Sequence, residues 1–265
     1  MSESLGLRPW MSAPETVAVF DALEAEGGAG CARFVGGCVR NALVARPIDD
    51  IDIATTLAPD QVTRALKAAG LSAIPTGIAH GTVTAVANHK PFEITTLRRD
   101  VTTDGRRATV VFTDDWAEDA QRRDFTLNSL YADRDGTIFD PTGRGVADAK
   151  AGRIVFVGEP EQRLAEDHLR NLRFFRFLAW FGKGAPDAAA LAACAVLKDN
   201  IQSLSAERVS KELLKLLAAD DPREAVRLMS EAGVLEVILK APANLARFAA
   251  LVEIEADLLF EAQSG

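Results

Sequence analysis

The distribution of apolar and polar residues divides the chain into a first part of mixed strands and helices and a second part of helices alone. In the first part, periodic apolar positions predict three helices, over residues 14–25, 38–45 and 59–69. Apolar and β-branched runs predict strands over residues 31–35 and 50–55, and a hairpin over residues 81–97. This mixture predicts a head of strands and helices that ends near residue 155.

The remaining segments are less regular or purely helical. Residues 98–115 are polar and lack periodicity, which predicts a mobile loop. Helical character returns over residues 116–131, and residues 133–140 predict a second hairpin. From about residue 161 helix-forming residues dominate, which predicts an all-helical segment. The final helical pattern, at EAQSG, has no strong stop signal, so we expect the chain to continue in a longer protein.

Composition narrows the class of protein without identifying a function. The chain has 265 residues, of which 48% are hydrophobic and 26% charged, as in ordinary globular proteins. No apolar run approaches the roughly 20 residues that cross a bilayer, and no signal pattern opens the chain, so we expect a cytoplasmic protein without a membrane partner. The three cysteines lack the spacing of a zinc site and are expected to be free thiols. A net charge of −8 argues against general nucleic-acid binding, although a local basic stripe could still bind phosphates.

The segment RPIDDIDIAT, residues 46–55, places three carboxylates within four positions of a predicted strand. Because residues two apart on a strand face the same side, Asp50 and Asp52 are expected to project together, away from Ile51 and Ile53. Two carboxylates in a partly buried place repel each other, and Mg²⁺, which prefers paired carboxylates with phosphate oxygens and water, would remove that repulsion. Taken alone, the D-x-D pattern favours the alternative of two aspartates on an exposed sheet edge.

A glycine turn precedes this strand. The segment VGGCVRN, residues 35–41, has the pattern of a strand end, two glycines and the start of a helix. Glycine lets the backbone approach a phosphate closely, and the N–H groups of a helix start attract anions. Gly37 and Arg40 are therefore candidates for binding a triphosphate whose metal would lie on the aspartates. A lone Gly-Gly pair usually marks only a tight turn, so the combination with D-x-D carries the prediction.

The segment GGCVRNALVARPIDDIDIAT resembles the signature of the class II tRNA nucleotidyltransferase and bacterial poly(A) polymerase family, in the polymerase-β-like superfamily. The usual pattern of that family is G-G-x-V-R-D-x-L-L-G-R-x-x-x-D-x-D. Three further blocks agree in order: FEITTLRRDV, RRDFTLNSLY and EDHLRNLRFFRF, so the resemblance covers roughly residues 30 to 240. Two residues depart from the pattern: Asn41 replaces the usual Asp, which removes a charge near the phosphate site, and Ala45 replaces the usual Gly.

The resemblance implies an α+β fold class, with a mixed sheet and flanking helices in a polymerase-β-like head. The implied domains are a catalytic head over residues 1–155, a helical neck over 156–220 that completes the nucleotide site, and the start of a helical body over 221–265. It implies that Arg123 holds the nucleotide, and that Asp124 and Asn128 shape the pocket. The plain alternative for this block is the first turn of an amphipathic helix with surface charges.

Glu93, in the alternating strand FEITTL, is the fitting candidate for a third carboxylate, which the superfamily commonly takes from a neighbouring strand. Such a group could hold a second metal or receive the proton of the attacking hydroxyl. The alternative, an exposed strand residue without a catalytic role, remains equally open.

The block EDHLRNLRFFRF predicts a helix on which Asp167, Arg170, Arg173 and Arg176 form a stripe, with apolar residues on the packed side. Its phenylalanines are expected to pack in the core, and the stripe alone fits a solvated charged face. In the family, Asp167 and Arg170 would read the incoming base, and Arg173 and Arg176 would support the nucleotide. A carboxylate accepts from the amino group of cytosine or adenine while a guanidinium donates to the ring nitrogen, whereas uracil and guanine present the opposite groups.

The resemblance therefore implies Mg²⁺-dependent transfer of CMP and AMP from CTP and ATP to the 3′ end of tRNA, without a template and with no protein partner. Poly(A) polymerase, which shares almost every motif, is the closest alternative. A catalytically inactive nucleotide- or RNA-binding module is a further alternative, against which the intact Asp50-Ile51-Asp52 argues. The sequence leaves open whether all three nucleotides of a CCA end are added, and in which oligomeric state.

Overall fold

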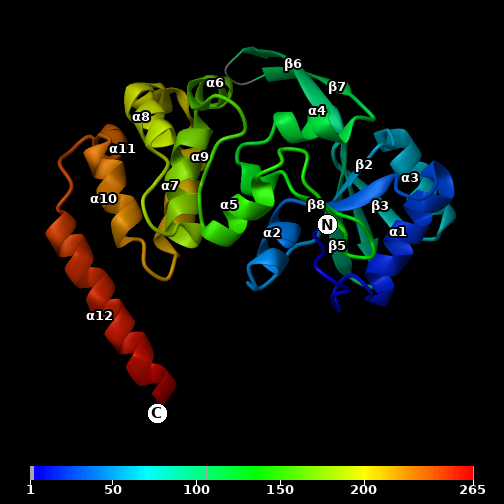
Figure 1. The fold of residues 1–265 in the computed structure, drawn as a ribbon, viewed down its shortest axis with the longest axis horizontal. Coiled ribbons are helices and arrows are strands. Elements are labelled where there is room, and N and C mark those ends of the chain that lie inside the picture. The colour runs from blue at the N-terminus through cyan, green and yellow to red at the C-terminus, as the bar shows by residue number, and fades with distance from the viewer. Residues whose placement is uncertain (1–2, 105–106, 265) are drawn as a thin grey trace. The chain divides into compact units, whose positions relative to one another are not determined.

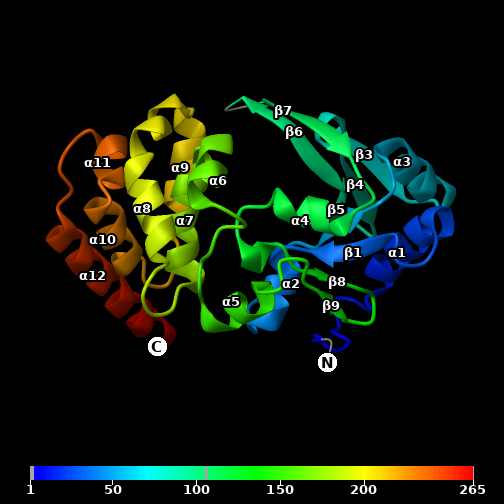
Figure 2. The ribbon, with the colours of Figure 1, turned by 45° about the horizontal axis from the view of Figure 1, so that its top comes forward.

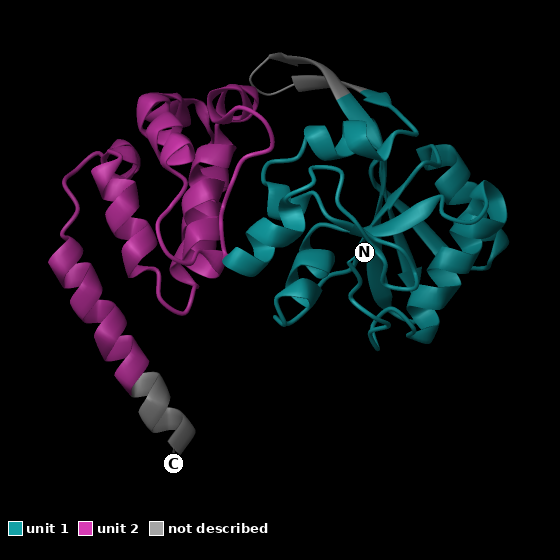
Figure 3. Ribbon diagram, in the orientation of Figure 1, with its two compact units in different colours: residues 1–151 teal, residues 152–265 magenta. Residues whose placement is uncertain are grey.

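The computed structural model describes the backbone of residues 3–104 and 107–264 and the side chains of residues 3–99 and 111–257. The chain forms two compact units, Met1–Ala151 and Gly152–Gly265, which are coloured separately in Figure 3. The predicted division into a head over 1–155, a neck over 156–220 and a body over 221–265 stays a prediction.

A seven-stranded mixed sheet forms the centre of the first unit, with the strand order β3-β4-β5-β2-β1-β8-β9 (Figure 1). The strands are β1 (Ala32–Val35), β2 (Asp52–Thr55), β3 (Ser72–Gly77), β4 (Thr82–Ala87), β5 (Lys90–Thr96), β8 (Tyr131–Ala132) and β9 (Ile138–Phe139). β2 and β5 run parallel, and the other neighbouring pairs are antiparallel. The predicted hairpin is confirmed: Asn88 and His89 have the positive φ angles, 48° and 64°, that a two-residue hairpin turn requires.

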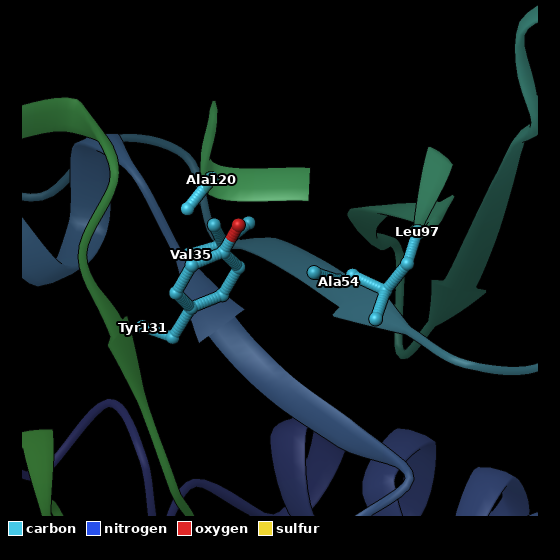
Figure 4. Packing of buried hydrophobic residues seen from close by; sticks show 5 residues of the cluster. All are labelled: Val35, Ala54, Leu97, Ala120 and Tyr131. Atoms are coloured by element: carbon cyan, nitrogen blue, oxygen red, sulfur yellow. The ribbon is translucent and has the colours of Figure 1, made fainter. Parts of the chain in front are cut away.

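Different helices cover the two faces of this sheet, and they can be followed in Figure 2. Phe34 of β1 packs on Phe20 of α1 (Pro14–Gly27), with ring centroids 4.5 Å apart. The neighbouring Arg33 points to the other face, where its guanidinium lies 4.4 Å from the ring of Trp116 at the start of α4 (Trp116–Gln121). The face towards α4 is filled by a buried cluster, shown in Figure 4, of Val35, Ala54, Leu97, Ala120 and Tyr131. Because side chains alternate along a strand, Asp52 lies on the same face as Ala54.

The first unit also contains the helices α2 (Gly37–Leu43), α3 (Pro59–Ala68) and α5 (Gly145–Ala151) and the short 3₁₀ turns η1 (Ile78–His80) and η2 (Thr126–Asn128). The helices predicted over residues 14–25, 38–45 and 59–69 are thus confirmed, within a few residues at their ends.

The sequence-based predictions for residues 98–115 and 116–131 are wrong. Residues 98–115 do not form a loop, because β6 (Arg98–Asp104) and β7 (Arg107–Phe112) pair as a separate two-stranded antiparallel sheet. Backbone pairing needs no apolar alternation, so a polar hairpin leaves little trace in the sequence. Residues 116–131 do not form one helix either, since α4 ends at Gln121 and a loop and η2 follow.

The strand predicted over residues 50–55 begins at Asp52, so the placement of Asp50 on it was wrong. β1 pairs Phe34 with Ile53 and then reverses at Gly36, whose φ is 68°, so it offers no partner to residues before Asp52. Pro47 also lacks the N–H that a strand ladder needs. Asp50 therefore lies in the exposed loop that leads into the strand.

The second unit contains helices from residue 160 onward, as predicted. They are α6 (Pro160–Glu166), α7 (Leu169–Phe181), α8 (Ala188–Val196), η3 (Lys198–Ser203), α9 (Ala206–Leu217), α10 (Arg223–Glu231), α11 (Val234–Leu239) and α12 (Leu245–Ser264). α7 packs against α9 and α10 and buries Phe174 and Phe175 completely, which confirms that these phenylalanines belong to the core.

Asp167 does not lie on one helix with the arginines, contrary to the prediction. It separates α6 from α7 in an extended conformation, with φ −147° and ψ 107°. Its carboxylate accepts a hydrogen bond from the backbone N–H of Leu169 at 3.1 Å, and thereby competes with continuation of the helix.

Two general expectations also have an outcome. The cysteines at 31, 38 and 194 are buried and free of disulfides, as expected. Within the backbone that the structure describes, no helix is long and apolar enough to cross a membrane.

The turn between α2 and β2 generates a prediction about stability. Ala45 has a φ of 55°, a left-handed conformation that is strained for a residue with a Cβ atom. We expect Ala45→Gly to raise the free energy of unfolding by about 0.5–1 kcal/mol, because the relief of strain exceeds the entropy that glycine adds to the unfolded chain. Urea unfolding measures the change. Ala25→Gly, at an exposed position in α1, is the matched control and should lower the free energy by a similar amount.

Candidate functional site

The turn at Gly36 and Gly37 brings two arginines together. The N–H of Gly36 donates to the carbonyl oxygen of Leu130 at 3.0 Å, which fixes the turn beside β8. A methyl group built on Gly36 would lie 3.8 Å from Nη1 of Arg123, and one built on Gly37 would lie 3.9 Å from Nη2 of Arg40. Both guanidinium groups therefore lie at the glycine turn, where a Cβ atom would narrow the space beside them.

The charges of two carboxylates act on a third, Asp52, at the start of β2. Glu93 stands beside Asp52 at the same register of the parallel strands β2 and β5, so both side chains lie on the same face of the sheet. The negative charges of Glu93 and Asp50 both act on Asp52. Asp52 is half-buried, whereas Asp50 and Glu93 are exposed. The structure thus brings together the three predicted carboxylates, although Asp50 reaches the cluster from the loop.

The pKa of Asp52 is shifted by its surroundings. Burial, and then the charges of Glu93 and Asp50, raise the pKa of Asp52 to about 6. The guanidinium groups of Arg123 and Arg40 act in the opposite direction and favour the ionised form. A further cation would stabilise the ionised form of such a carboxylate, and a strongly shifted pKa beside specific charged partners is one sign of a functional site.

Arg40 is held from two sides. Its Nε and Nη2 donate to Oδ1 of Asn41 at 3.1 and 2.9 Å, and its Nη1 donates to Oδ1 of Asn128. The amide nitrogen of Asn128 in turn donates to Oδ1 of Asp124 at 3.0 Å. Asp124 and Asn128 are both buried, so the interpretation of this block as surface charge on a helix is wrong. These residues act on Arg40 and thereby shape its surroundings.

Arg123 is positioned by a buried acid that the sequence analysis missed. Nη2 and Nε of Arg123 donate to Oδ2 of Asp119 at 2.9 and 3.1 Å, and the same oxygen accepts from the hydroxyl of Tyr131 at 2.7 Å. Asp119 is 1% exposed, and although its burial acts to raise its pKa, Arg123 and Arg122 hold that pKa well below the ordinary value. The spacing of Asp119 to Arg122 and Arg123, three and four residues, was the available signal.

The donor set in the first unit fits a divalent cation together with phosphate. Carboxylate oxygens of Asp50 and Asp52 are the ligands that Mg²⁺ prefers, and Mg²⁺ usually takes its remaining ligands from phosphates and water. Among the residues with described side chains, no group of three or more His, Cys, Asp or Glu is arranged to hold a metal ion by itself. The candidate site therefore consists of a carboxylate pair whose other ligands would come from a bound phosphate group. Arg40 and Arg123 supply the matching positive charge.

In the second unit, Asp167 contacts an arginine that the sequence analysis also missed. Nη2 of Arg208, on α9, lies 3.1 and 3.2 Å from the two carboxylate oxygens of Asp167. Arg170, on the first turn of α7, instead donates from Nη1 to Glu166 at 2.6 Å and to the carbonyl oxygen of Arg163 at 3.0 Å. Both predicted base-reading groups thus have fixed neighbours. No local spacing pointed to Arg208, which lies 41 residues from Asp167.

The two later arginines of α7 have different surroundings. Arg176 forms an ion pair of 3.0 Å with Glu212 of α9, a residue that is 6% exposed. Arg173 lies with its guanidinium 5.5 Å from the ring of Phe177. Arg176 thus joins α7 to α9, a contact that its predicted place on a solvated stripe did not suggest. The nucleotide-binding roles of Arg173 and Arg176 stay predictions.

Comparison with known proteins places these residues in a family. Residues 32–155 match the model of the poly A polymerase head domain, and residues 186–245 match that of the probable RNA and SrmB-binding site of polymerase A. CCA tRNA nucleotidyltransferase 1, mitochondrial, of Mus musculus is 43% identical over 223 residues, which cover 82% of this chain and 50% of that protein. The CCA-adding enzyme of Streptococcus gordonii is 35% identical over 252 residues, covering 94% of this chain and 61% of that enzyme.

A solved structure agrees with these matches. The Bacillus stearothermophilus CCA-adding enzyme in complex with CTP superimposes with a TM-score of 0.74 and 35% identity, over 86% of this chain and 53% of that one. The chain therefore spans between about half and three fifths of the length of these relatives. The mixed sheet and the similarity to this solved structure confirm the predicted fold class, an α+β head followed by helices. The chain belongs to the tRNA nucleotidyltransferase and poly(A) polymerase family.

Proposed function

We propose that this protein transfers CMP and AMP from CTP and ATP to the 3′-hydroxyl of tRNA, building or repairing its CCA end. The observation that carries the proposal is the meeting of Asp50, Asp52 and Glu93 with Arg40 and Arg123 beside the glycine turn. The two relatives described above are named for CCA addition, and the similar solved structure is a complex with CTP. Since the chain spans only part of these proteins, the whole activity is inferred from the site.

In this proposal Asp50 and Asp52 hold Mg²⁺. When bound, the ion would activate the attacking hydroxyl and neutralise charge on the transferring phosphoryl group. The fit rests on the electrostatics of Asp52, whose pKa is raised by burial and by the negative charges of Glu93 and Asp50, so that a cation would favour its ionised form. Glu93, exposed beside Asp52, is positioned either to accept the proton of the hydroxyl or to hold a second ion.

The remaining residues of the first unit bind and orient the triphosphate. Gly37 leaves room for phosphate oxygens near the backbone, while Arg40 and Arg123 bind them by charge-assisted hydrogen bonds. The 3′-hydroxyl oxygen forms a bond to the α-phosphorus. The bond between that phosphorus and the oxygen that bridges it to the β-phosphate breaks, and pyrophosphate leaves. Asp124, Asn128 and Asp119 do not contact the reacting atoms in this scheme, and they hold the two arginines in place.

Base selection is assigned to Asp167 and Arg170, with support from Arg173 and Arg176. One oxygen of Asp167 already accepts from the backbone of Leu169, and Arg208 lies against both oxygens, so the carboxylate has a defined orientation. An ionised carboxylate accepts from the amino group of cytosine or adenine, and it leaves the carbonyl of uracil or guanine without a donor. An unmade hydrogen bond of this kind costs about 1–3 kcal/mol.

Location in the cytoplasm, tRNA as the partner and the absence of a protein partner remain part of the same proposal. Poly(A) synthesis and nucleotide binding without catalysis are its alternatives. The three functions predict different products from tRNA that lacks its 3′ end. CCA addition gives a defined extension by two C and one A, poly(A) synthesis gives a long A ladder, and binding without catalysis gives no extension.

Incorporation by Asp50→Ala/Asp52→Ala tests the catalytic pair. With tRNA lacking its CCA end, Mg²⁺, CTP and ATP, we expect the wild-type protein to add two C and one A, and the double variant to lose at least about a thousandfold in rate, because both metal ligands are gone. Products are sized on a denaturing gel. Asp49→Ala removes an exposed neighbouring carboxylate and should keep its activity. Retained activity in the double variant would disprove the assignment.

Stability as a function of pH tests the electrostatic tension at Asp52. Since the pKa of Asp52 is raised to about 6 in the folded protein, this group contributes stability below its unfolded value near 3.8, and loses that contribution as pH rises through 6. In EDTA, Asp52→Asn should therefore raise the free energy of unfolding by about 2 kcal/mol at pH 7.5 and by little at pH 4. Urea unfolding at the two pH values gives the comparison.

The same measurement has an internal control and a metal test. Asp49→Asn should show no such dependence on pH, because its side chain is exposed. Mg²⁺ with inorganic tripolyphosphate should stabilise the wild-type protein more than Asp52→Asn. If the Asp52→Asn variant is less stable than the wild type at pH 7.5, the neighbouring carboxylates do not repel Asp52 enough to destabilise the fold.

Substitution of Asp167 tests base selection. Asp167→Asn gives the side chain an amide donor that can pair with the carbonyl of uracil, so the preference for CTP over UTP in kcat/KM should fall by about tenfold or more. Single-nucleotide incorporation with each triphosphate measures the ratio. Glu161→Gln, at an exposed position on α6, is the control and should leave the ratio unchanged. An unaltered ratio in Asp167→Asn would remove Asp167 from base selection.

A further inference from the structure

The side-chain amide of Asn41 is bound on both of its ends. Its Oδ1 accepts from Nε and Nη2 of Arg40 at 3.1 and 2.9 Å, and its Nδ2 donates to the carbonyl oxygen of Pro47 at 2.7 Å. The opposite orientation of the amide would set its NH₂ against guanidinium donors and its oxygen against a carbonyl oxygen, so only one orientation satisfies all three contacts. Asn41 therefore links Arg40 to the segment that leads into Asp50.

An aspartate, which the family pattern has at this position, cannot make both links. Its two oxygens are acceptors only when ionised, so one could pair with Arg40 while the other would lie against the carbonyl oxygen of Pro47. That contact would be repulsive and would release the segment from Arg40. The amide thus provides a connection that the usual carboxylate excludes.

The linked segment also contains a strained residue. Ala45 adopts a φ of 55° between Asn41 and Pro47, and the backbone N–H of Arg46 donates to the carbonyl oxygen of Asn41 at 2.9 Å. A strained backbone persists only where surrounding contacts determine it. Asn41 takes part in both hydrogen bonds: its carbonyl oxygen accepts from Arg46, and its side-chain nitrogen donates to Pro47. This one residue therefore restrains the turn at two points.

We propose that Asn41 is a positioning residue that couples Arg40, the phosphate-binding group, to the loop that carries Asp50, a metal-binding group. This inference rests on the proposed function for the roles of Arg40 and Asp50. The coupling means that a change at Asn41 alters phosphate binding and metal binding together, although its side chain is assigned no contact with either ligand. Asn128 accepts from the remaining terminal nitrogen of the same guanidinium, so two amides help to orient Arg40.

The test measures the two kinds of binding separately, without nucleotide or tRNA. Calorimetry gives the affinity for inorganic tripolyphosphate in EDTA, and electron paramagnetic resonance gives the affinity for Mn²⁺ alone. Asn41→Ala should weaken both by about threefold to tenfold, as expected for lost hydrogen bonds that orient a ligand-binding group. Asn41→Asp should weaken tripolyphosphate binding further, because it adds negative charge beside Arg40.

The matched control is Asn88→Asp, which adds the same charge at an exposed hairpin turn and should change neither affinity. Thermal unfolding identifies any variant that fails to fold, and the remaining Asn41 variant then decides. Unchanged affinities, or a change in tripolyphosphate affinity alone, would overturn the coupling. Nucleotide incorporation by the wild-type protein is assayed in parallel, so that failure of the proposed function is distinguished from failure of the coupling.

Discussion

Repulsion among carboxylates at the start of β2 is the constraint on which the candidate site depends. Asp52 is half-buried beside Glu93 on the neighbouring strand, and the charge of Asp50 acts on it from the preceding loop. Such crowding destabilises a fold unless cations offset it, and the chain supplies two guanidinium groups at the adjacent glycine turn. Burial, together with the charges of Glu93 and Asp50, still raises the pKa of Asp52 to about 6, and a metal ion with a phosphate ligand would favour the ionised form.

The scaffold around this cluster serves mainly to fix the two arginines. Arg123 is bound by Asp119, and Asp119 is also bound by the hydroxyl of Tyr131 within the buried cluster below α4. A buried ion pair contributes little net stability, because desolvation offsets most of the attraction, but it determines where the charges lie. The position of a guanidinium at the glycine turn is therefore coupled to the packing of the core. Partner residues also fix the predicted site residues in the second unit, where Glu212 forms an ion pair with Arg176 and Arg208 contacts Asp167.

The elements that could be predicted from the sequence are those whose signal is local. Proline starts, glycine stops and the Asn88-His89 turn predicted α1, α3 and the β4–β5 hairpin within a few residues. The cluster of chemistry-bearing residues in the first unit was also predictable, because the resemblance extends over ordered blocks. The β6–β7 hairpin was not, since its pairing depends on backbone hydrogen bonds between polar residues, and neither was the break at Asp167, where a side chain competes with the helix.

Partners distant in the sequence were likewise beyond prediction, and they bear most directly on the roles of the site residues. Glu212 and Arg208 lie on a helix with no motif, yet they determine the surroundings of Arg176 and Asp167. The two departures from the family pattern, Asn41 and Ala45, are only four positions apart: Asn41 lies in α2, and Ala45 lies in the turn that follows this helix. Asn41 restrains that turn through both its backbone and its side chain, while Ala45 strains it. A neutral amide that can donate as well as accept is compatible with this strained turn, whereas a carboxylate would lose the bond to Pro47, so the two departures are physically consistent with each other.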